Sequence, residues 1–572
     1  MKKTAKILNI IMALCLAGLP FARLIFGVDF TDTGYSVTNF INFTDKRATW
    51  SVSTYLSNLC GHIFMQLPFG KTFIGIRAYC TFVVSGLLVF LFLKLNKRYN
   101  FVAVFLGLLI SLFLTWCPFT VLYNYLSYFL IAVVVFLLLE GIDEDKKLKL
   151  VLAGVVLGLA VFARISNFTY ALLIVPAIVF GILLHKEAKV VLKETLCCVG
   201  GFAGGFLLMF VLSGLTHGFS AYSDMISSLT ALSGAEYGYS FSDMLLTLPK
   251  AVIHYGKWLF LLACCLAVSL FSSKKFKDEE KAKLISWALA GSVLMCFLII
   301  LRYMSYWSVF TIHDYNGFLS VEIFVVVSVL ASLVISIVSV ASDKFDARRK
   351  FISLCVICFI IVTPLGTNTG MASYENNLSL ILPASLGSLY VLLTGEDKKI
   401  RFLPLRALSY VLLAALLFQS TRFYMDYCYG SAGNGELTAS FEKGVLKGTR
   451  ALPGMVDIIE GLEDNVRSCN LSGREVITWG DIPLMGFVLD MPTAFSTGWP
   501  DLTSFSEDTF VKELSTMDKP VIIVNRWFSG GDPLNPEVWQ YSKKAEILSD
   551  FMYEKNYRLT FENDKFRVYL AD

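Results

Sequence analysis

Charged side chains are scarce in this chain. Only 16% of its 572 residues are Asp, Glu, Lys or Arg, whereas a soluble domain of ordinary composition carries about a quarter. Hydrophobic residues make up 56% of the chain, and the mean hydropathy is +0.64. A water-surrounded core has no room for so much apolar surface, so a lipid bilayer must solvate most of the chain. The net charge of only +4 gives no indication of a nucleic-acid partner.

Paired cysteine motifs of the kind that hold structural zinc are also missing. Cys355 and Cys358 form a single CxxC inside an apolar run, where cysteine behaves as a small apolar residue. Cys428 and Cys469 lie in the polar C-terminal part of the chain. They are candidates for a disulfide if that part is exported, with two free thiols as the alternative.

Basic residues are nearly absent from every second hinge between the apolar runs. Lys and Arg cluster in one set of hinges, near residues 2–6, 94–98, 146–149, 186–193, 274–283, 344–350 and 398–406. The hinges between them hold few basic residues, chiefly Lys46, Arg47 and Lys71. Because hinges rich in Lys and Arg stay in the cytoplasm, this alternation predicts a cytoplasmic N-terminus.

Thirteen apolar runs are long enough to cross a bilayer as helices, which takes roughly 17–25 residues. They lie near 7–27, 73–93, 101–117, 121–140, 149–164, 167–184, 194–214, 250–272, 284–303, 318–341, 351–366, 377–394 and 405–422. We interpret the first as a retained span rather than a cleaved signal peptide. For the short runs 149–164 and 167–184, a hairpin that does not fully cross is the alternative. An odd number of spans places the C-terminus outside.

The segments between the runs divide the chain into two domains. Residues 1–422 are expected to form a helical membrane domain with two long outside loops, 28–72 and 215–249. Residues 423–572 have ordinary soluble composition and are expected to form an extracytoplasmic α/β domain. Strands are predicted at 475–479, 520–524 and 566–570, and helices near 438–463 and 507–515. Residues 50–69 predict an amphipathic helix that lies in the membrane interface.

Two carboxylates stand directly after the first apolar run. Asp29 and Asp32 lie where the chain reaches the predicted outer membrane surface. A carboxylate in such a place is a candidate general base, or a ligand for Mg²⁺ or Mn²⁺. Gly34 permits a tight turn, and Tyr35 offers a flat wall and a hydroxyl to a substrate. The alternative is that both carboxylates cap the following helix.

This loop resembles that of the GT-C glycosyltransferases. The match is a first span followed by a long outside loop that opens with acidic, small and aromatic residues, here Asp32-Thr33-Gly34-Tyr35. Enzymes of this superfamily are polytopic and transfer sugars, typically from polyprenyl-phosphate-linked donors, on the outer membrane face. An Asp or Glu of the loop serves them as catalytic base, metal ligand or both. The resemblance therefore implies Asp32 first and Asp29 second as catalytic residues, with Asp32 as the candidate metal ligand, although the spacing here is DxxD rather than DxD.

The layout of the chain is similar to the oligosaccharyltransferase and protein-mannosyltransferase branches of that superfamily. Both combine an N-in, C-out bundle with an extracytoplasmic C-terminal domain. Softer matches lie at residues 123–128 and 164–167. No WWDYG-like motif is present, which argues against an oligosaccharyltransferase proper, so neither sugar nor acceptor is inherited from the resemblance.

Further polar residues near the outer ends of spans are candidates for substrate binding. Arg164 and Arg302 each lie at the outer end of a span, and a guanidinium there suits a phosphate, with a snorkelling anchor as the alternative. His313 and Asp314 lie on a short outside loop, where an ordinary loop role is the alternative. Glu375 lies in an outside stretch rich in amides and hydroxyls, groups that bond sugars and also make turns.

These observations predict a membrane glycosyltransferase. It moves a sugar, with inversion, from a polyprenyl-phosphate-linked donor to an extracytoplasmic glycan, lipid or protein, and a divalent cation is the candidate cofactor. The short Lys-rich start favours a bacterial plasma membrane with the site on its outer face. The alternative is a transporter or flippase of a lipid-linked or polar solute. The sequence shows no internal repeat and few acids within the runs, which favours the transferase.

Overall fold

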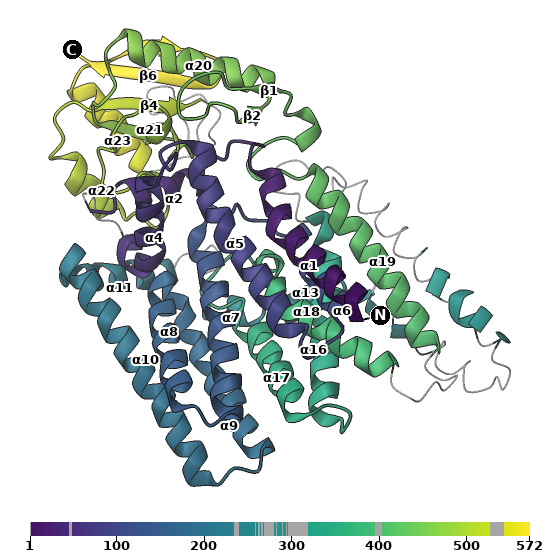
Figure 1. Cartoon of the computed structure of the whole chain (residues 1–572). Coiled ribbons are helices and arrows are strands. Elements are labelled where there is room, and N and C mark those ends of the chain that lie inside the picture. Colours follow the sequence, from purple (N-terminus) through teal and green to yellow (C-terminus); the bar gives the residue numbers. More distant parts are fainter. Residues whose placement is uncertain are drawn as a thin grey trace.

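The chain forms a bundle of long helices with a mixed α/β domain on one end of it (Figure 1). This computed structural model describes residues 2–44, 49–233, 240–257, 319–394, 403–526 and 543–572, and scattered positions between 259 and 295. Within these residues seven helical segments are long and apolar enough to cross a membrane. The chain is therefore a polytopic helical membrane protein. The count of thirteen spans and the N-in orientation stay predictions.

Eleven of the thirteen predicted spans coincide with described helices, and the runs 250–272 and 284–303 lie largely outside the described residues. The helices of the bundle and its loops are α1 (Lys2–Gly18), η1 (Leu19–Arg23), α2 (Asp32–Ile41), α3 (Thr49–Ser53), α4 (Tyr55–Gln66), α5 (Phe73–Leu95), α6 (Phe101–Phe113), α7 (Leu122–Asp143), α8 (Lys147–Ala163), η2 (Ile165–Leu173), α9 (Ile174–Leu183), α10 (Ala188–His217), α11 (Ser220–Ser233), α12 (Phe241–Leu245), α13 (Thr247–His254), α16 (Leu319–Ala341), α17 (Ala347–Val362), α18 (Ala372–Thr394) and α19 (Leu403–Asp426).

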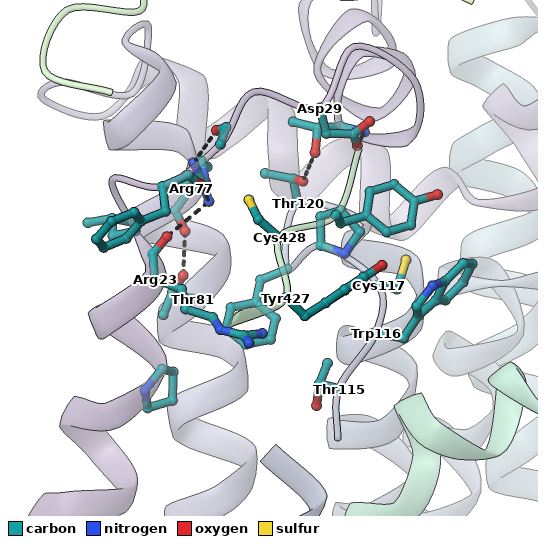
Figure 2. A pocket seen from close by; sticks show the side chains of 18 of the residues that line it. Arg23, Asp29, Arg77, Thr81, Thr115, Trp116, Cys117, Thr120, Tyr427 and Cys428 are labelled. Carbon is teal, nitrogen blue, oxygen red and sulfur yellow. Dashed lines mark hydrogen bonds between the residues drawn. The ribbon is translucent and has the colours of Figure 1, made fainter. Parts of the chain in front are cut away.

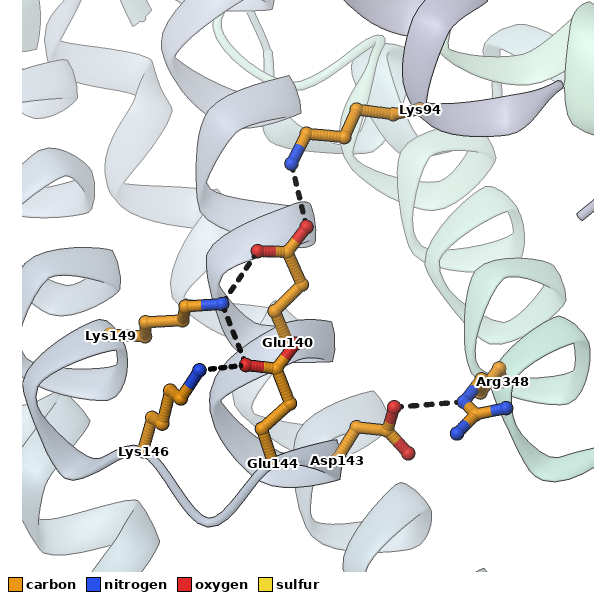
Figure 3. A network of polar contacts seen from close by, with 7 residues as sticks. All are labelled: Lys94, Glu140, Asp143, Glu144, Lys146, Lys149 and Arg348. Atoms are coloured by element: carbon orange, nitrogen blue, oxygen red, sulfur yellow. Dashed lines mark hydrogen bonds and ion pairs between the residues drawn. The ribbon is translucent and has the colours of Figure 1, made fainter. Parts of the chain in front are cut away.

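Basic residues from several hinges of the Lys- and Arg-rich set meet at one end of the bundle (Figure 3). Glu140 accepts from Lys94 at 2.6 Å and from Lys149 at 2.8 Å. Asp143 accepts from Arg348 at 2.8 Å. α5 begins beside the α/β domain and ends next to Lys94, about 33 Å away at 1.5 Å per residue. That length matches a bilayer core, so these basic residues lie about the thickness of a bilayer core away from the α/β domain.

Glycines bring α8 and α10 close together. A Cβ added at Gly154 would lie 2.0 Å from the carbonyl oxygen of Cys198, and one at Gly201 would lie 2.1 Å from that of Val151. Small residues four apart allow such close backbone packing in membrane helices. This packing fixes the position of α8, whose C-cap is the candidate residue Arg164.

A four-stranded sheet forms the centre of the C-terminal domain, in the order β3-β4-β6-β5. β3 and β4 are parallel, and the other two pairings are antiparallel. Apolar side chains cover both faces of the sheet, against α20 on one face and α22 and α23 on the other. The elements are η6 (Asn434–Glu436), β1 (Ala439–Ser440), β2 (Arg450–Ala451), α20 (Pro453–Ser468), β3 (Val476–Trp479), α21 (Met485–Val488), α22 (Glu507–Leu514), β4 (Val521–Asn525), α23 (Lys543–Glu554), β5 (Tyr557–Glu562) and β6 (Phe566–Ala571).

The three predicted strands and the helix near 507–515 are confirmed, but the helix predicted near 438–463 is wrong in its first half. Residues 439–451 instead form the small antiparallel pair β1–β2. Gly444 and Gly448 take positive φ values of 65° and 83° in the connection, which ends helical propagation. α20 begins only at Pro453, where the fixed φ of proline suits a first helical position.

The C-terminal domain docks on the loop after the first helix. Gly27 donates its N–H to the carbonyl of Arg450 at 2.9 Å, and Leu484 donates to that of Phe30 at 3.1 Å. Gly34 lies so close to Leu484 that an added Cβ would be 2.3 Å from its backbone nitrogen. The docking thus depends on backbone contact, and it places the domain over the segment that holds the two candidate carboxylates.

Residues 50–69 form two helices rather than the single interfacial helix predicted. α3 ends at Ser53, and α4 starts at Tyr55 after the irregular residue Thr54. α4 packs against α2, α5, α7 and α8. Its face with Ser57 and Asn58 is buried against the bundle, while the apolar side chains of Ile63, Leu67 and Phe69 are exposed.

Candidate functional site

A cavity of about 730 Å³ lies between the helical bundle and the C-terminal domain. It brings together three of the predicted site residues, Asp32, Tyr35 and Arg164. Residues from several other parts of the chain line the rest of its wall, among them Asn39, Ser53, Ser57, Asn58, Trp116, Tyr123, Asn124, Tyr128, Thr367, Asn368, Thr369, Asn376, Tyr429, Trp499, Thr503 and Ser504. Hydroxyls, amides and aromatic rings predominate, which is the chemistry of a carbohydrate site.

Asp32 is the first residue of α2 and lies partly open to this cavity. The hydroxyl of Tyr429 donates a hydrogen bond to its Oδ2. Burial raises the pKa of Asp32 to about 7, with further upward contributions from the charges of Asp29 and Asp481, while the bond from Tyr429 lowers it. A carboxylate whose pKa lies near neutral pH is suited to take up a proton during turnover.

Asp29 does not line the cavity of Asp32. Its Oδ1 accepts from the backbone N–H of Thr31 at 2.9 Å and its Oδ2 from that of Thr33 at 2.6 Å, in the first turn of α2. The residue is 5% exposed and lies on a separate, small cavity, away from Asp32's cavity (Figure 2). These bonds agree with the helix-capping alternative, while a catalytic role of Asp29 stays a prediction.

Arg164 lies where the helical path breaks between α8 and η2. Its backbone is extended, with φ −160° and ψ 124°. Its guanidinium donates to Oδ1 of Asn124 at 2.9 Å and to the carbonyl of Gly366 at 2.9 Å, and it lies 5.6 Å from the ring centre of Tyr123. In the described part of the chain these acceptors are neutral, so the positive charge remains available to an anion in the cavity.

Two aromatic pairs flank Asp32. Tyr35 contacts Trp499 edge-on, with ring centres 5.9 Å apart, and Trp116 contacts Tyr429 in the same way at 5.2 Å. The indole N–H of Trp499 donates to Oδ1 of Asp481 at 3.0 Å, which fixes the ring at the edge of the C-terminal domain. Tyr35 thus lies on the cavity wall, as predicted, and aromatic faces of this kind stack on sugar rings.

Glu375 does not line the cavity, contrary to its predicted role. Its neighbours Ser373 and Asn376 face the cavity from the first turn of α18, and Asn376 Oδ1 accepts from the N–H of Cys117 at 3.0 Å. Residues three apart share a helix face, whereas Glu375 points to another side. Its side chain is fully buried, on the side of the neighbouring carboxylate Glu322.

The other three predicted substrate residues, Arg302, His313 and Asp314, lie outside the described residues. Of the two alternatives for Cys428 and Cys469, the structure shows free thiols and no disulfide between them.

The described side chains do not assemble a metal site. Among them no three His, Cys, Asp or Glu residues come together to hold an ion. Asp32 is the single carboxylate among the described residues that line the cavity. One carboxylate is a poor cage for Mg²⁺ or Mn²⁺, which prefer several oxygen ligands. The divalent cation stays an expectation, and no step below is derived through it.

Tyr429 and Asn124 also line the cavity and bond to its charged groups, and neither is among the candidates named from the sequence. Tyr429 reaches Asp32 from a position 397 residues further along the chain, and nothing in its neighbourhood marks it. Asn124 belongs to the stretch 123–128 that carried a soft family match, which is the signal that pointed toward it.

No protein-family model matches the chain, and no curated protein matches it in sequence. Similar solved structures include ArnT from Cupriavidus metallidurans in the apo state, at 12% identity and TM-score 0.44, covering 100% of this chain and 98% of that one. The same protein bound to undecaprenyl phosphate matches at 11% identity and TM-score 0.41, with the same coverage. An oligosaccharyltransferase from Archaeoglobus fulgidus, in complex with zinc and sulfate, matches at 14% identity and TM-score 0.41, covering 91% of this chain and 70% of that one.

Proposed function

We propose that this protein is a membrane glycosyltransferase of GT-C type that transfers a sugar from a polyprenyl-phosphate-linked donor. The observation that carries the proposal is the meeting of Asp32 and Arg164 in one cavity whose walls are aromatic and rich in hydroxyls and amides. Asp32 is a base with a pKa near neutral pH, and Arg164 is a cation whose hydrogen-bond partners are neutral. The polyprenyl-phosphate donor comes from the resemblance of the first loop.

The side chains support an inverting displacement. Asp32 takes the proton from an acceptor hydroxyl, whose oxygen then attacks the anomeric carbon of the sugar. The bond from this carbon to the phosphate oxygen breaks on the opposite face, and the electron pair leaves with the phosphate. A phosphate needs no protonation to leave, which agrees with a cavity that offers one carboxylate. Arg164 stabilises the negative charge that grows on the leaving oxygen.

The C-terminal domain supplies part of the substrate wall in this proposal. Trp499, Thr503 and Ser504 reach the cavity from the loop between β3 and α22. The docking contacts of Gly27 and Leu484 hold that loop against the membrane domain. We therefore propose that residues 1–422 form the domain that holds the base. Residues 423–572 form the domain that closes the site and helps to select the acceptor. The acceptor is a glycan, a lipid or a protein. The charge alternation of the hinges supports a site on the outer face of the membrane.

Asp32 and Asp29 provide a matched pair for a test. Asp32→Asn removes the base and is expected to lower transfer by at least about 100-fold. Asp29→Asn keeps an acceptor oxygen for the N–H of Thr33, so transfer is expected to stay within a few-fold of wild type. The measurement is release of polyprenyl phosphate from a panel of radiolabelled polyprenyl-phosphate sugars by purified protein in lipid nanodiscs.

Substantial transfer by Asp32→Asn would overturn the assignment of the base. If wild type neither binds nor turns over any donor of the panel, the transporter or flippase alternative is favoured. Movement of a lipid-linked sugar between bilayer leaflets without release of polyprenyl phosphate would establish that alternative.

A further inference from the structure

One loop forms the part of the Asp32 cavity that belongs to the C-terminal domain beyond α21. The cavity is lined there by Trp499, Leu502, Thr503 and Ser504, which all lie between β3 and α22. The chain has no regular helix or strand from residue 494 to residue 506. Because no helical or sheet ladder fixes this loop, side chains from elsewhere must hold it in shape. We call residues 499–504 the wall loop.

Lys544 bonds the wall loop from α23. It is the second residue of that helix, and it is only 7% exposed. Its Nζ donates to the carbonyl of Pro500 at 3.0 Å and to that of Leu502 at 2.9 Å. In the described part of the chain its hydrogen bonds go to these two carbonyls and not to a carboxylate. A lysine is rarely buried without a paired charge, so the bonds to the wall loop account for its position.

The Lys544 side chain is an ammonium at neutral pH. Burial lowers the pKa of its amino group to about 8, while the charges of Asp501 and Glu507 raise it. Hydrogen bonds that a charged group donates are about twice as strong as those between neutral groups. Because both acceptors are main-chain carbonyls of the wall loop, these bonds fix the course of its backbone and not one side chain alone.

Asp481 holds the ring of Trp499, the first residue of the wall loop. Its Oδ1 accepts from the indole N–H of Trp499 at 3.0 Å. Its backbone N–H donates to Oδ2 of Asp501 at 3.0 Å, and the carbonyl of Gly480 before it accepts from Asn525 at 2.9 Å. Asp481 lies just after β3 and Asn525 ends β4, so these bonds tie the wall loop to the end of the parallel strand pair.

The same loop also touches the membrane domain. A Cβ added at Gly498, directly before the wall loop, would lie 2.4 Å from Cγ2 of Thr38 on α2. The ring of Trp499 contacts that of Tyr35 on the same helix, with ring centres 5.9 Å apart. α2 begins with the proposed base, Asp32. The place of the wall loop relative to the base therefore depends on the bonds that Lys544 and Asp481 make to the loop.

We infer that Lys544 and Asp481 are positioning residues of the proposed reaction, which hold the wall loop in the shape that binds substrate. Neither is among the described residues that line the cavity, so both act through the loop. The inference rests on the proposed function. The wall loop supplies neither the base nor the cation, so its shape affects substrate binding more than the chemical step. Loss of either residue is therefore expected to raise KM and to leave kcat nearly unchanged.

Lys544→Met tests the first residue, and Lys543→Met is its matched control. Methionine fills the space of the buried stem and removes the ammonium. Lys543 is the neighbouring lysine on α23, and it is largely exposed and paired with Glu507 at 3.2 Å. Both variants and wild type are compared as purified full-length protein in lipid nanodiscs at about pH 7, where Lys544 is charged.

Two measurements are made on each protein. The first is KM and kcat for release of polyprenyl phosphate from the radiolabelled donor that wild type uses best. The second is hydrogen exchange of residues 499–505 without substrate, which reports the amides of Leu502 and Phe505 that bond within the loop.

Lys544→Met is expected to raise KM roughly ten-fold, because two charge-assisted hydrogen bonds to the wall loop are lost. Its kcat is expected to change by less than about three-fold. Exchange of residues 499–505 is expected to be roughly ten-fold faster than in wild type. Lys543→Met is expected to match wild type in both measurements.

Asp481 offers a second pair of variants, which decides the inference if Lys544→Met does not fold. Asp481 has a φ of 58°, a conformation that asparagine and glycine both adopt readily. Asp481→Asn keeps an oxygen that accepts from the Trp499 indole, whereas Asp481→Gly keeps none. At about pH 9, where Asp32 is charged in each protein, Asp481→Gly is expected to raise KM several-fold and Asp481→Asn to stay near wild type.

Faster exchange of the wall loop together with a raised KM supports the inference. Unchanged exchange in Lys544→Met, or faster exchange with an unchanged KM, would overturn it. A loss confined to kcat would also contradict it, because such a loss indicates a role in the chemical step. Equal KM values for Asp481→Gly and Asp481→Asn would exclude Asp481 from positioning Trp499. If wild type transfers no sugar, the proposed function fails by itself, and the exchange measurement still decides whether Lys544 holds the wall loop.

Discussion

The hydrogen bond from Tyr429 to Asp32 determines the pH at which the proposed base becomes active. In Tyr429→Phe the aromatic contact with Trp116 is kept, while the donor to Oδ2 of Asp32 is lost. This bond favours the charged form of the carboxylate, whereas burial and the charge of Asp29 oppose it. Its removal must therefore raise the pKa of Asp32 above its value of about 7.

The size of this effect follows from the energy of a hydrogen bond to a charged group, about 1.5–3 kcal/mol. Asp32 lies partly open to the cavity, so the lower end of this range applies. Since 1.36 kcal/mol corresponds to one pKa unit, the pKa of Asp32 rises by about one unit. Transfer needs Asp32 in its charged, carboxylate form, so the rate of transfer falls as pH drops through the pKa of Asp32. At neutral pH the variant is several-fold slower, and above about pH 9 it approaches wild type.

The measurement is kcat/KM for release of polyprenyl phosphate between about pH 5.5 and 9.5, because this parameter reports the free enzyme. Tyr557→Phe is a matched control, since it removes a buried tyrosine hydroxyl that bonds the carbonyl of Pro520, inside the C-terminal domain. Its pH profile should coincide with that of wild type. An unchanged or lowered midpoint in Tyr429→Phe would refute the reasoning, as would an equal rate loss at every pH.

Three further changes test other parts of the structure. Gly34→Ala places a Cβ 2.3 Å from the backbone nitrogen of Leu484. It is expected to destabilise domain docking by about 1–3 kcal/mol and so to lower the thermal midpoint of unfolding. An unchanged midpoint would contradict the close contact. Trp499→Ala removes the aromatic wall beside Tyr35 and should lower kcat/KM roughly ten-fold, mainly through KM; an unaltered KM would exclude Trp499 from substrate binding. Burial raises the pKa of Asp501 to about 7, so its contribution to the free energy of unfolding is full below about pH 4 and is lost as pH rises through 7. In Asp501→Asn the thermal midpoint should therefore fall less over that pH range. A pH profile equal to that of wild type would contradict this.

Much of the fold follows from local patterns in the sequence. Apolar runs of sufficient length become helices because the bilayer leaves no water to satisfy a bare backbone. The strands at 476–479 and 521–525 are mainly apolar and almost wholly buried, so their short apolar runs make them predictable from the sequence. β5 is not predicted from the sequence because it lies at the sheet edge. Exposed polar residues such as Arg558 and Glu562 interrupt the apolar pattern that would indicate a strand. The β1–β2 pair depends on two glycine conformations that no apolar pattern records.

The candidate site was predictable only in part, because a sequence gives residue types but not their directions. The sequence indicates Asp32 by its place directly after the first span and Arg164 by its place at the outer end of a span, and the structure brings both to one cavity. Asp29 has the same carboxylate three residues earlier, but it accepts a hydrogen bond from the N–H of Thr33, whereas Asp32 faces the cavity. The sequence does not distinguish the two carboxylates, because the difference lies in the backbone geometry of the loop. Glu375 was chosen for its neighbourhood, yet a rotation along α18 turns it away from the cavity that Asn376 faces.

The most distant contacts explain why the site needs both domains. Asp32 stands on a loop of the membrane domain, but Tyr429, which donates to it, and Trp499, which flanks it, belong to the chain after α19. Undocking the C-terminal domain would expose Asp32 to water and remove the hydrogen bond to its Oδ2. The pKa elevation that burial causes would then largely disappear, and the carboxylate would return toward the value of an ordinary, weakly basic Asp. Proton uptake from the acceptor is therefore coupled to domain docking, so the base is strong only when the wall that selects the acceptor is in place.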